Sequence, residues 1–297
     1  MTKMTRRTLV TALPAASALS AAKPGFALCI HQTTNLNAGF RKSLEGYSKV
    51  GIRFAEIIPQ HYDEFVNKEG AAAAKRLMSD LGIKPVSSGG VRGLVEPNPT
   101  RAKSVEELKS RAERVAQLGV DRMVIPCAAT ARYTPDDYKK GAENLREVGE
   151  IVKGFGVTAM LEFMRGSTFA GSVPTALQLV REANHPNARF MFDFYHFYAG
   201  LSKLEDLDLI RPGEIHHVHF QDVPRIPREL LDNASRDIPG DGVAPLDRIL
   251  KGVRKAGYSG PLSVELFYPR LQNGDPYEVA MEIKKKCEAV LRKAGML

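Results

Sequence analysis

The stretch RFMFDFYHFYAGLSKLEDLDLIRPGEIHHVHF (residues 189–220) contains two short hydrophobic runs, 189–194 and 215–220, separated by a longer connection. Their length and aromatic content are typical of buried strands. Including these two, eight such runs alternate with helical patterns along the chain: residues 26–31, 54–58, 85–88, 122–126, 158–163, 189–194, 215–220 and 262–267. This order predicts a closed eight-stranded parallel (β/α) TIM barrel. An open doubly wound sheet is the alternative, but no GxGxxG turn follows the first run.

Helix start signals lie between the runs. Ser104 with Glu107 has the spacing of a capping box, and Thr134 precedes a proline and two acidic residues. Asp275 before Pro276 repeats that pattern near the C-terminus. These signals predict helices that begin at the three capping residues.

The composition allows one large domain. The chain has 297 residues, of which 43% are hydrophobic, so it can bury a substantial core. Lys3, Arg6 and Arg7 supply three of its eight excess positive charges, and the remaining excess is spread without long blocks of one sign. We therefore expect no nucleic-acid partner. The three cysteines form no paired motif and predict no disulfide framework.

Residues 1–22 have the features of an export signal. Arg6 and Arg7 precede an apolar, alanine-rich stretch, as in the twin-arginine type, and small residues at 20–22 suit cleavage. We expect an exported, periplasmic protein whose residues 23–297 form a single TIM-barrel catalytic domain. An unstructured alanine-rich extension is the alternative. No run reaches the ~20 apolar residues that a membrane span requires.

Four runs carry a metal-type ligand near their C-terminal end. These ligands are Glu162, Asp193, His219 and Glu265. A parallel barrel brings its strand ends to a common mouth, where an unpaired buried carboxylate would be costly. We therefore predict one divalent metal ion at this mouth, although any one of the acids could instead be a cap or a salt-bridge partner. An oxygen-rich set favours Mn²⁺, with Mg²⁺, Co²⁺ or Zn²⁺ as alternatives.

The motifs 161–163, 193–196, 217–222, 239–242 and 257–265, taken in order, resemble the xylose-isomerase-like TIM barrel superfamily. More narrowly, the chain resembles the sugar phosphate isomerase/epimerase branch, over about residues 26–292. The resemblance implies metal ligation by the four residues named above. It also implies that His196 and Arg225 contact substrate oxygens.

Three further residues are candidates for the same mouth. Arg236 lies in the long irregular stretch 224–242, together with Arg225, and could reach the mouth equally well. His31 ends the first run and is a candidate for the pocket lining. Asp222 would suit a residue that orients a metal ligand.

This set of residues predicts proton abstraction next to a carbonyl. A metal polarises the substrate, and Glu162 or Glu265 removes or returns the proton through an enediolate. We expect an isomerase or epimerase of an unphosphorylated keto sugar or related polyol. A lyase or dehydratase acting on a keto-glycoside or keto-inositol is the alternative, because residues 163–168 lack the additional glutamate of ketose 3-epimerases.

Two remote alternatives are an endonuclease-like barrel and a non-catalytic sugar-binding barrel. An endonuclease would need more histidines, and none lies between His61 and His185. The expected partner is a small carbohydrate, and a homo-oligomer is left open.

Overall fold

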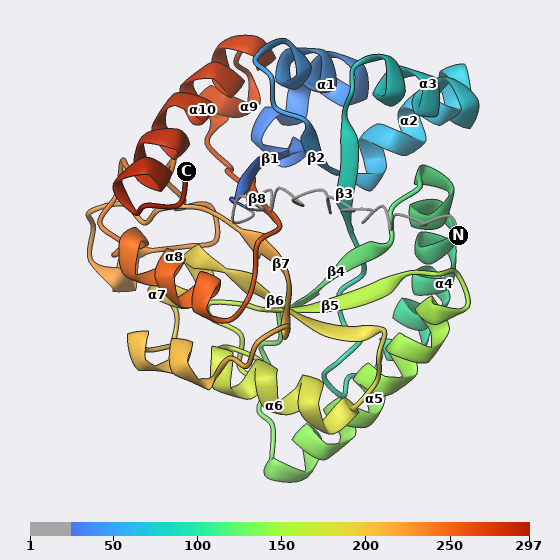
Figure 1. The fold of residues 1–297 in the computed structure, drawn as a ribbon. Helices are drawn as coiled ribbons and strands as arrows, with labels where there is room; N and C mark the ends of the chain where they lie inside the picture. The colour runs from blue at the N-terminus through green and yellow to red at the C-terminus, as the bar shows by residue number, and fades with distance from the viewer. Residues whose placement is uncertain (1–24) are drawn as a thin grey trace, which may run out of the picture.

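The computed structural model describes residues 25–297, which form a closed barrel of eight parallel strands inside a ring of helices (Figure 1). The strands are β1 (Ala27–His31), β2 (Phe54–Ile57), β3 (Lys84–Gly89), β4 (Arg122–Cys127), β5 (Thr158–Phe163), β6 (Ala188–Asp193), β7 (Ile215–His219) and β8 (Pro261–Val264). Each strand pairs with the next in sequence, and β8 pairs with β1 to close the barrel. The predicted fold class is confirmed. The proposed export signal at 1–22 lies outside the described residues.

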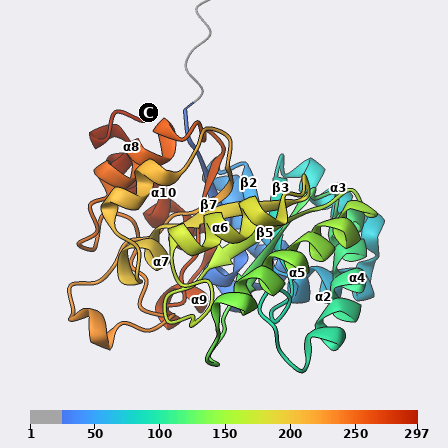
Figure 2. The ribbon, with the colours of Figure 1, turned by 90° about the horizontal axis from the view of Figure 1, so that it is seen from below.

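The helices cover the outside of the barrel, and Figure 2 shows the ring from below. They are α1 (Gly39–Lys49), α2 (Pro59–Glu69), α3 (Ala71–Asp80), α4 (Arg101–Leu118), α5 (Pro135–Lys153), α6 (Val173–Ala183), α7 (Phe194–Ala199), α8 (Leu246–Lys255), α9 (Pro269–Gln272) and α10 (Pro276–Lys293). Helix α10 packs beside α1, so the two ends of the described chain meet. Within residues 25–297, no helix combines the length and apolar character needed to cross a bilayer.

Two of the three predicted helix starts are confirmed. Thr134 and Asp137 form a reciprocal capping box, and the Asp275 side chain accepts hydrogen bonds at the start of α10. The start predicted at Ser104 was wrong, because α4 begins at Arg101. The Arg101 side chain donates to the Leu94 carbonyl (2.8 Å) and anchors the additional turn.

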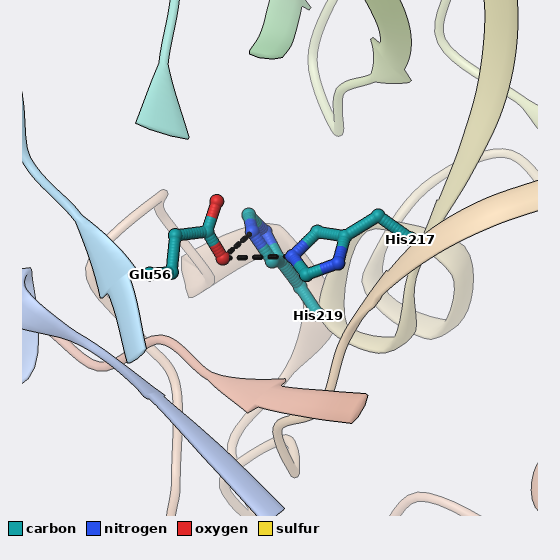
Figure 3. Close-up of side chains that lie close together, drawn as sticks. All are labelled: Glu56, His217 and His219. Carbon is teal, nitrogen blue, oxygen red and sulfur yellow. Dashed lines mark hydrogen bonds and ion pairs between the residues drawn. The ribbon is translucent and has the colours of Figure 1, made fainter. Parts of the chain in front are cut away.

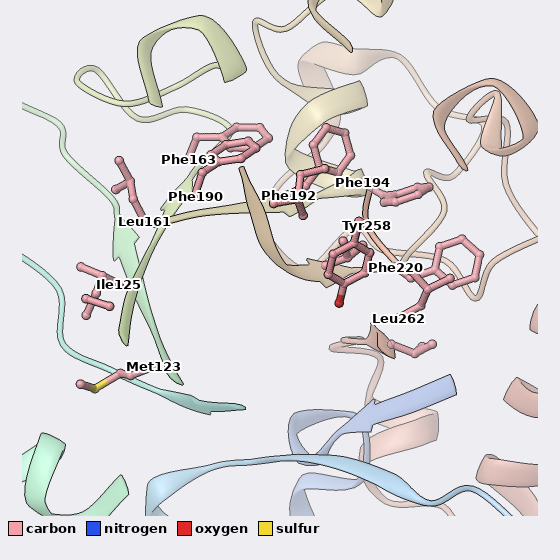
Figure 4. Close-up of a cluster of buried hydrophobic side chains, with 14 of the residues drawn as sticks. Met123, Ile125, Leu161, Phe163, Phe190, Phe192, Phe194, Phe220, Tyr258 and Leu262 are labelled. Carbon is pink, nitrogen blue, oxygen red and sulfur yellow. The ribbon is translucent and has the colours of Figure 1, made fainter. Parts of the chain in front are cut away.

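Side chains on the barrel strands alternate between the helices and the barrel interior. The outward set on β5 and β6 includes Phe163 and Phe190, whose rings stack with centroids 5.9 Å apart (Figure 4). The inward residues Val124, Met160 and Met191 form a separate buried cluster. This period of two places the next inward positions of β5 and β6, two residues further on, at the barrel mouth.

Four strands, β2, β6, β7 and β8, end earlier than the sequence predicts, and two of them bear on the site. Strand β8 ends at Val264 rather than at residue 267. The Thr34 hydroxyl donates to the Val264 carbonyl (3.0 Å) and accepts from the Leu266 amide (3.1 Å), in place of further strand pairing. Strand β6 ends at Asp193, which caps α7 by accepting from the His196 amide (2.6 Å). The predicted ligands therefore all lie within one residue of a strand end.

Replacement of Phe192 by alanine should destabilise the barrel. Its ring is fully buried and lies 5.0 Å, centroid to centroid, from that of Phe197. We expect a loss of about 3–5 kcal/mol in the free energy of unfolding, measured by urea denaturation. Leu201→Ala is the matched control because Leu201 is 74% exposed, and it should change stability by less than about 0.5 kcal/mol. Equal effects of the two substitutions would contradict this packing.

Candidate metal and substrate site

Four side chains from the ends of β5 to β8 converge at the barrel mouth. The Nδ1 atom of His219 lies 3.2 Å from Glu162 Oε1, 3.4 Å from Asp193 Oδ2 and 3.4 Å from Glu265 Oε2. One ligand atom from each of the four lies within 4.8 Å of the others. We call these four residues the mouth cluster. The structure brings together every residue that the sequence proposed as a metal ligand.

The donor atoms of the mouth cluster suit a divalent cation. Glu162 Oε1 and His219 Nδ1 are buried and have no hydrogen-bond partner. A proton on Nδ1 could bond to only one of the three facing carboxylates, whereas a cation could contact all of them. Three carboxylate oxygens and one imidazole nitrogen are compatible with Mn²⁺, Mg²⁺, Co²⁺ or Zn²⁺.

The electrostatics of His219 lead to the same conclusion. Burial alone would lower the pKa of His219, but Glu56 and Glu265 hold that pKa well above its ordinary value. These carboxylates therefore stabilise positive charge at the position that the imidazole occupies.

The two glutamates of the mouth cluster differ in proton affinity. Burial raises the pKa of Glu162 above its ordinary value, and the charges of Glu265 and Asp193 add to this effect against the opposing influence of His219. Burial would also raise the pKa of Glu265, but Arg236 and His219 lower it below the ordinary value. Divergent proton affinities in neighbouring carboxyl groups are typical of acid and base pairs.

A second buried cluster lies behind His219 and consists of Glu56, His217 and His219 (Figure 3). Glu56 Oε2 lies 2.8 Å from His217 Nε2, 3.1 Å from His219 Nε2 and 2.7 Å from Ser263 Oγ. Burial opposes ionisation of Glu56, but His217 and His219 hold its pKa well below the ordinary value. An ionised carboxylate only accepts hydrogen bonds, so we assign a proton to Nε2 of both histidines.

Glu56 thereby orients His219 for metal binding. With Nε2 donating to Glu56, the Nδ1 lone pair points toward the mouth cluster, in the carboxylate–histidine–metal arrangement. Three donors already satisfy Glu56 Oε2, and neither Glu56 nor His217 lines the cavity at the mouth. Of the two clusters, the mouth cluster is therefore the better candidate for a cation site. Sequence reasoning missed Glu56, although a lone acid inside the run 54–58 was an available signal.

Arg236 enters the site from the loop between β7 and α8. Its side chain is 1% exposed, and its guanidinium lies 5.1 Å and 4.8 Å from the ring centroids of Tyr195 and Phe267. Nη1 forms an ion pair with Glu265, and Nη2 lies 3.0 Å from His196 Nε2. The loop thus delivers a buried positive charge to the edge of the mouth cluster.

His196 and Arg236 place two nitrogen atoms side by side, 3.0 Å apart. His196 Nδ1 accepts from the Arg165 amide (3.0 Å), and burial lowers the pKa of His196 to about 4. The neutral ring therefore carries its proton on Nε2, beside the Arg236 guanidinium, which also only donates. His196 therefore lies directly behind the Arg236 guanidinium, which lines the cavity.

The other predicted contact residues differ in position. His31 lines the cavity, with Nε2 lying 3.8 Å from Glu265 Oε1, and its Nδ1 accepts from the Thr33 amide (3.1 Å). Arg225 is exposed, does not line the cavity and makes no side-chain hydrogen bond or ion pair within residues 25–297. The structure therefore brings His31, His196 and Arg236 to the site, but not Arg225.

Asp222 organises the loop rather than a metal ligand, so the role predicted for it was wrong. Its carboxylate accepts from the backbone amides of Val223, Gly240, Gly242 and Ala244 at 2.8–3.0 Å. A side chain at Gly242 would collide with Asp222, since a Cβ there would lie 2.5 Å from Oδ1. The residue that orients a ligand is its neighbour Gln221, whose Nε2 donates to Asp193 Oδ2 (3.1 Å).

A cavity of about 340 Å³ opens above the mouth cluster. Its lining includes His31, Glu162, His219, Arg236 and Glu265. Potential ligands for a cation and a donor for a substrate oxygen therefore share one cavity.

The chain matches the sequence profile of the xylose isomerase-like TIM barrel over residues 44–287. It belongs to this family. An inosose isomerase of Bacillus velezensis is 28% identical over 282 residues, covering 91% of this chain and 98% of that protein. A 3-dehydroshikimate dehydratase of Pseudomonas putida is 25% identical over 241 residues, covering 79% of this chain but only 37% of the dehydratase.

Solved structures support the same xylose isomerase-like fold. A crystal structure of the IOLI protein with a bound zinc atom aligns with a TM-score of 0.84 at 24% identity, covering 91% of this chain and 99% of that one. That likeness concerns the fold, and the zinc atom belongs to that protein.

Replacement of Glu56 by glutamine should weaken metal binding without removing a ligand. The variant no longer fixes the His219 ring with an ionised acceptor, so we expect a roughly 10- to 100-fold increase in Kd for Mn²⁺, measured by calorimetry. Glu150→Gln is the matched control, because Glu150 also pairs with a histidine (His185, 2.8 Å) but is 64% exposed. Unchanged affinity in Glu56→Gln would refute the orienting role.

Proposed function

We propose that this protein is a divalent-metal-dependent isomerase or epimerase of an unphosphorylated keto sugar or related polyol. The observation that carries the proposal is the meeting of Glu162 and Glu265 at one candidate cation site that opens into a cavity. The similarity to an inosose isomerase supports the same reaction class. Mn²⁺ is the proposed metal, on the chemistry of the donor set alone.

The chemistry begins at the carbon beside the substrate carbonyl. A divalent cation held by the mouth cluster would supply Lewis acidity toward that carbonyl and its neighbouring hydroxyl. Glu162 accepts the proton as the C–H bond breaks, and the electron pair of that bond forms the enediolate double bond. Return of a proton to the neighbouring carbon gives isomerisation. Return of a proton to the original carbon from the opposite face gives epimerisation. Glu265 is the partner carboxyl group for that second transfer.

His196 and Arg236 position the substrate. Arg236 lines the cavity, where a hydroxyl or carbonyl oxygen would accept from it, and His196 Nε2 lies 3.0 Å from Arg236 Nη2, behind the cavity lining. Charge-assisted donation from Arg236 also stabilises negative charge that develops on that oxygen. Arg236 thus takes the role that the sequence resemblance assigned to Arg225.

Elimination is the second candidate function. The same enediolate can expel a β-leaving group, so a lyase acting on a keto-glycoside or keto-inositol would need little change in this site. The similarity to a dehydratase over 79% of this chain favours keeping this candidate. Release of a dehydrated product, rather than a rearranged one, would identify it.

From the sequence of residues 1–22, we also propose that the protein is exported. Sugar phosphates are mainly intracellular, so an exported enzyme would act on an unphosphorylated substrate. The small carbohydrate remains the only partner that we propose.

Metal removal and carboxyl substitution should both abolish proton abstraction. We expect Glu162→Gln and Glu265→Gln to lower the rate of deuterium incorporation from D₂O into an inosose by about 10²–10⁴-fold, measured by mass spectrometry. Treatment with a chelator should give the same loss, and added Mn²⁺ should restore the wild-type rate. Full exchange after complete metal removal would contradict the mechanism, and unaltered exchange in both variants would exclude the assigned roles.

Arg236 and Arg225 should differ in their effect on substrate binding. Arg236→Gln removes a buried donor from the cavity, and we expect KM to rise about tenfold or more. Arg225→Gln should leave KM within about twofold, because the Arg225 side chain is exposed and outside the cavity. Thermal melting checks that both variants are folded. The reverse order of effects would favour the motif-based assignment of Arg225.

A further inference from the structure

The cavity above the mouth cluster extends to helix α4. Its lining there includes Glu107 and Arg111 of that helix, together with Arg92 from the connection between β3 and α4. The cavity therefore has two chemically different ends. One end carries the candidate cation ligands, and the other carries two arginines that the proposed reaction does not use.

Arg111 has an unused donor edge. Only 21% of its side-chain area is exposed, and its Nε atom is buried and has no hydrogen-bond partner. Its nearest acid is Glu107, with Oε1 3.8 Å from Nη2, which is too long for a hydrogen bond. A guanidinium that lines a cavity and has no hydrogen-bonded carboxylate can pair with both oxygens of a bound carboxylate.

Two other arginines on α4 form closer ion pairs with carboxylates. Arg101 Nη1 lies 2.8 Å from Glu147 Oε2, and Arg114 Nε lies 3.3 Å from Asp63 Oδ1. Both of these arginines are engaged through contacts that Arg111 lacks. Arg92 is exposed and has no ion pair within residues 25–297. Arg92 and Arg111 therefore bring positive charge to the cavity that no carboxylate within residues 25–297 engages at hydrogen-bond distance.

The charge at this end suits a single negative charge. Arg92 and Arg111 carry two positive charges and Glu107 carries one negative charge, which leaves an excess of one. Glu107 would repel a doubly charged phosphate more strongly than a carboxylate. A carboxylate is therefore the better match in both charge and geometry.

We infer that the substrate is a keto-sugar acid whose carboxylate binds Arg111, with Arg92 beside it, while its carbonyl lies at the mouth cluster. This inference rests on the proposed function, because it uses the same cavity. Arg111 and Arg92 bind and orient the substrate, and they take no part in the proton transfer. A neutral keto sugar can react at the same site but binds more weakly.

Three ketoses that differ only at C6 test this inference: fructose, fructuronate and fructose 6-phosphate. Their Kd values are measured by calorimetry on the full-length, Mn²⁺-loaded protein. We expect fructuronate to bind about tenfold or more tightly than fructose. Arg111→Gln should remove this advantage and leave the Kd of fructose unchanged. Arg114→Gln is the matched control on the same helix and should preserve the preference.

Each outcome has a definite meaning. The inference is overturned if fructuronate does not bind, or binds no more tightly than fructose. It is also overturned if Arg111→Gln changes the Kd of fructuronate and of fructose equally. Tighter binding of fructose 6-phosphate than of fructuronate also overturns it, in favour of a phosphate. Deuterium exchange with each ketose is recorded in parallel. Arg111-dependent binding of fructuronate without deuterium exchange would contradict the proposed function but uphold the carboxylate site. Deuterium exchange without a preference for fructuronate over fructose would uphold the proposed function but contradict the carboxylate site.

Discussion

The repulsion among three buried carboxylates at the barrel mouth is the constraint on which the site depends. Two like charges 4 Å apart repel by about 4 kcal/mol at an effective dielectric of 20. Glu162, Asp193 and Glu265 each approach His219 Nδ1 within 3.4 Å, so they cannot avoid one another. The fold balances this repulsion with Arg236 and His219, and the donor set leaves room for a cation to complete the balance.

The barrel makes this crowding possible because neighbouring strands deliver neighbouring ligands. Asp193 and His219 are direct partners in the β6–β7 register, and His219 pairs with Ser263 of β8. Around this frame, Glu56 fixes the His219 ring and Gln221 holds Asp193. Two of the candidate ligands, His219 and Asp193, are therefore held by hydrogen bonds from outside the mouth cluster.

The sequence predicted the parts of this site that depend on local pattern. Positions near the ends of three successive runs were enough to place Glu162, Asp193 and His219 at the mouth of a barrel. They could not distinguish Arg236 from Arg225, because the loop conformation depends on the Asp222 carboxylate binding amides up to 22 residues away. The role of Glu56 could not be predicted from the sequence for a related reason. Its role arises from contacts with His217 and Ser263, which lie 161 and 207 residues away along the chain.

Anomalous diffraction from crystals grown with Mn²⁺ tests the central claim most directly, because two clusters share His219. The account predicts one strong peak about 2.0–2.3 Å from His219 Nδ1 and from oxygens of Glu162, Asp193 and Glu265. A peak on the Nε2 side of His219, between Glu56 and His217, would contradict the assignment. So would the absence of any peak at the barrel mouth from crystals saturated with the metal.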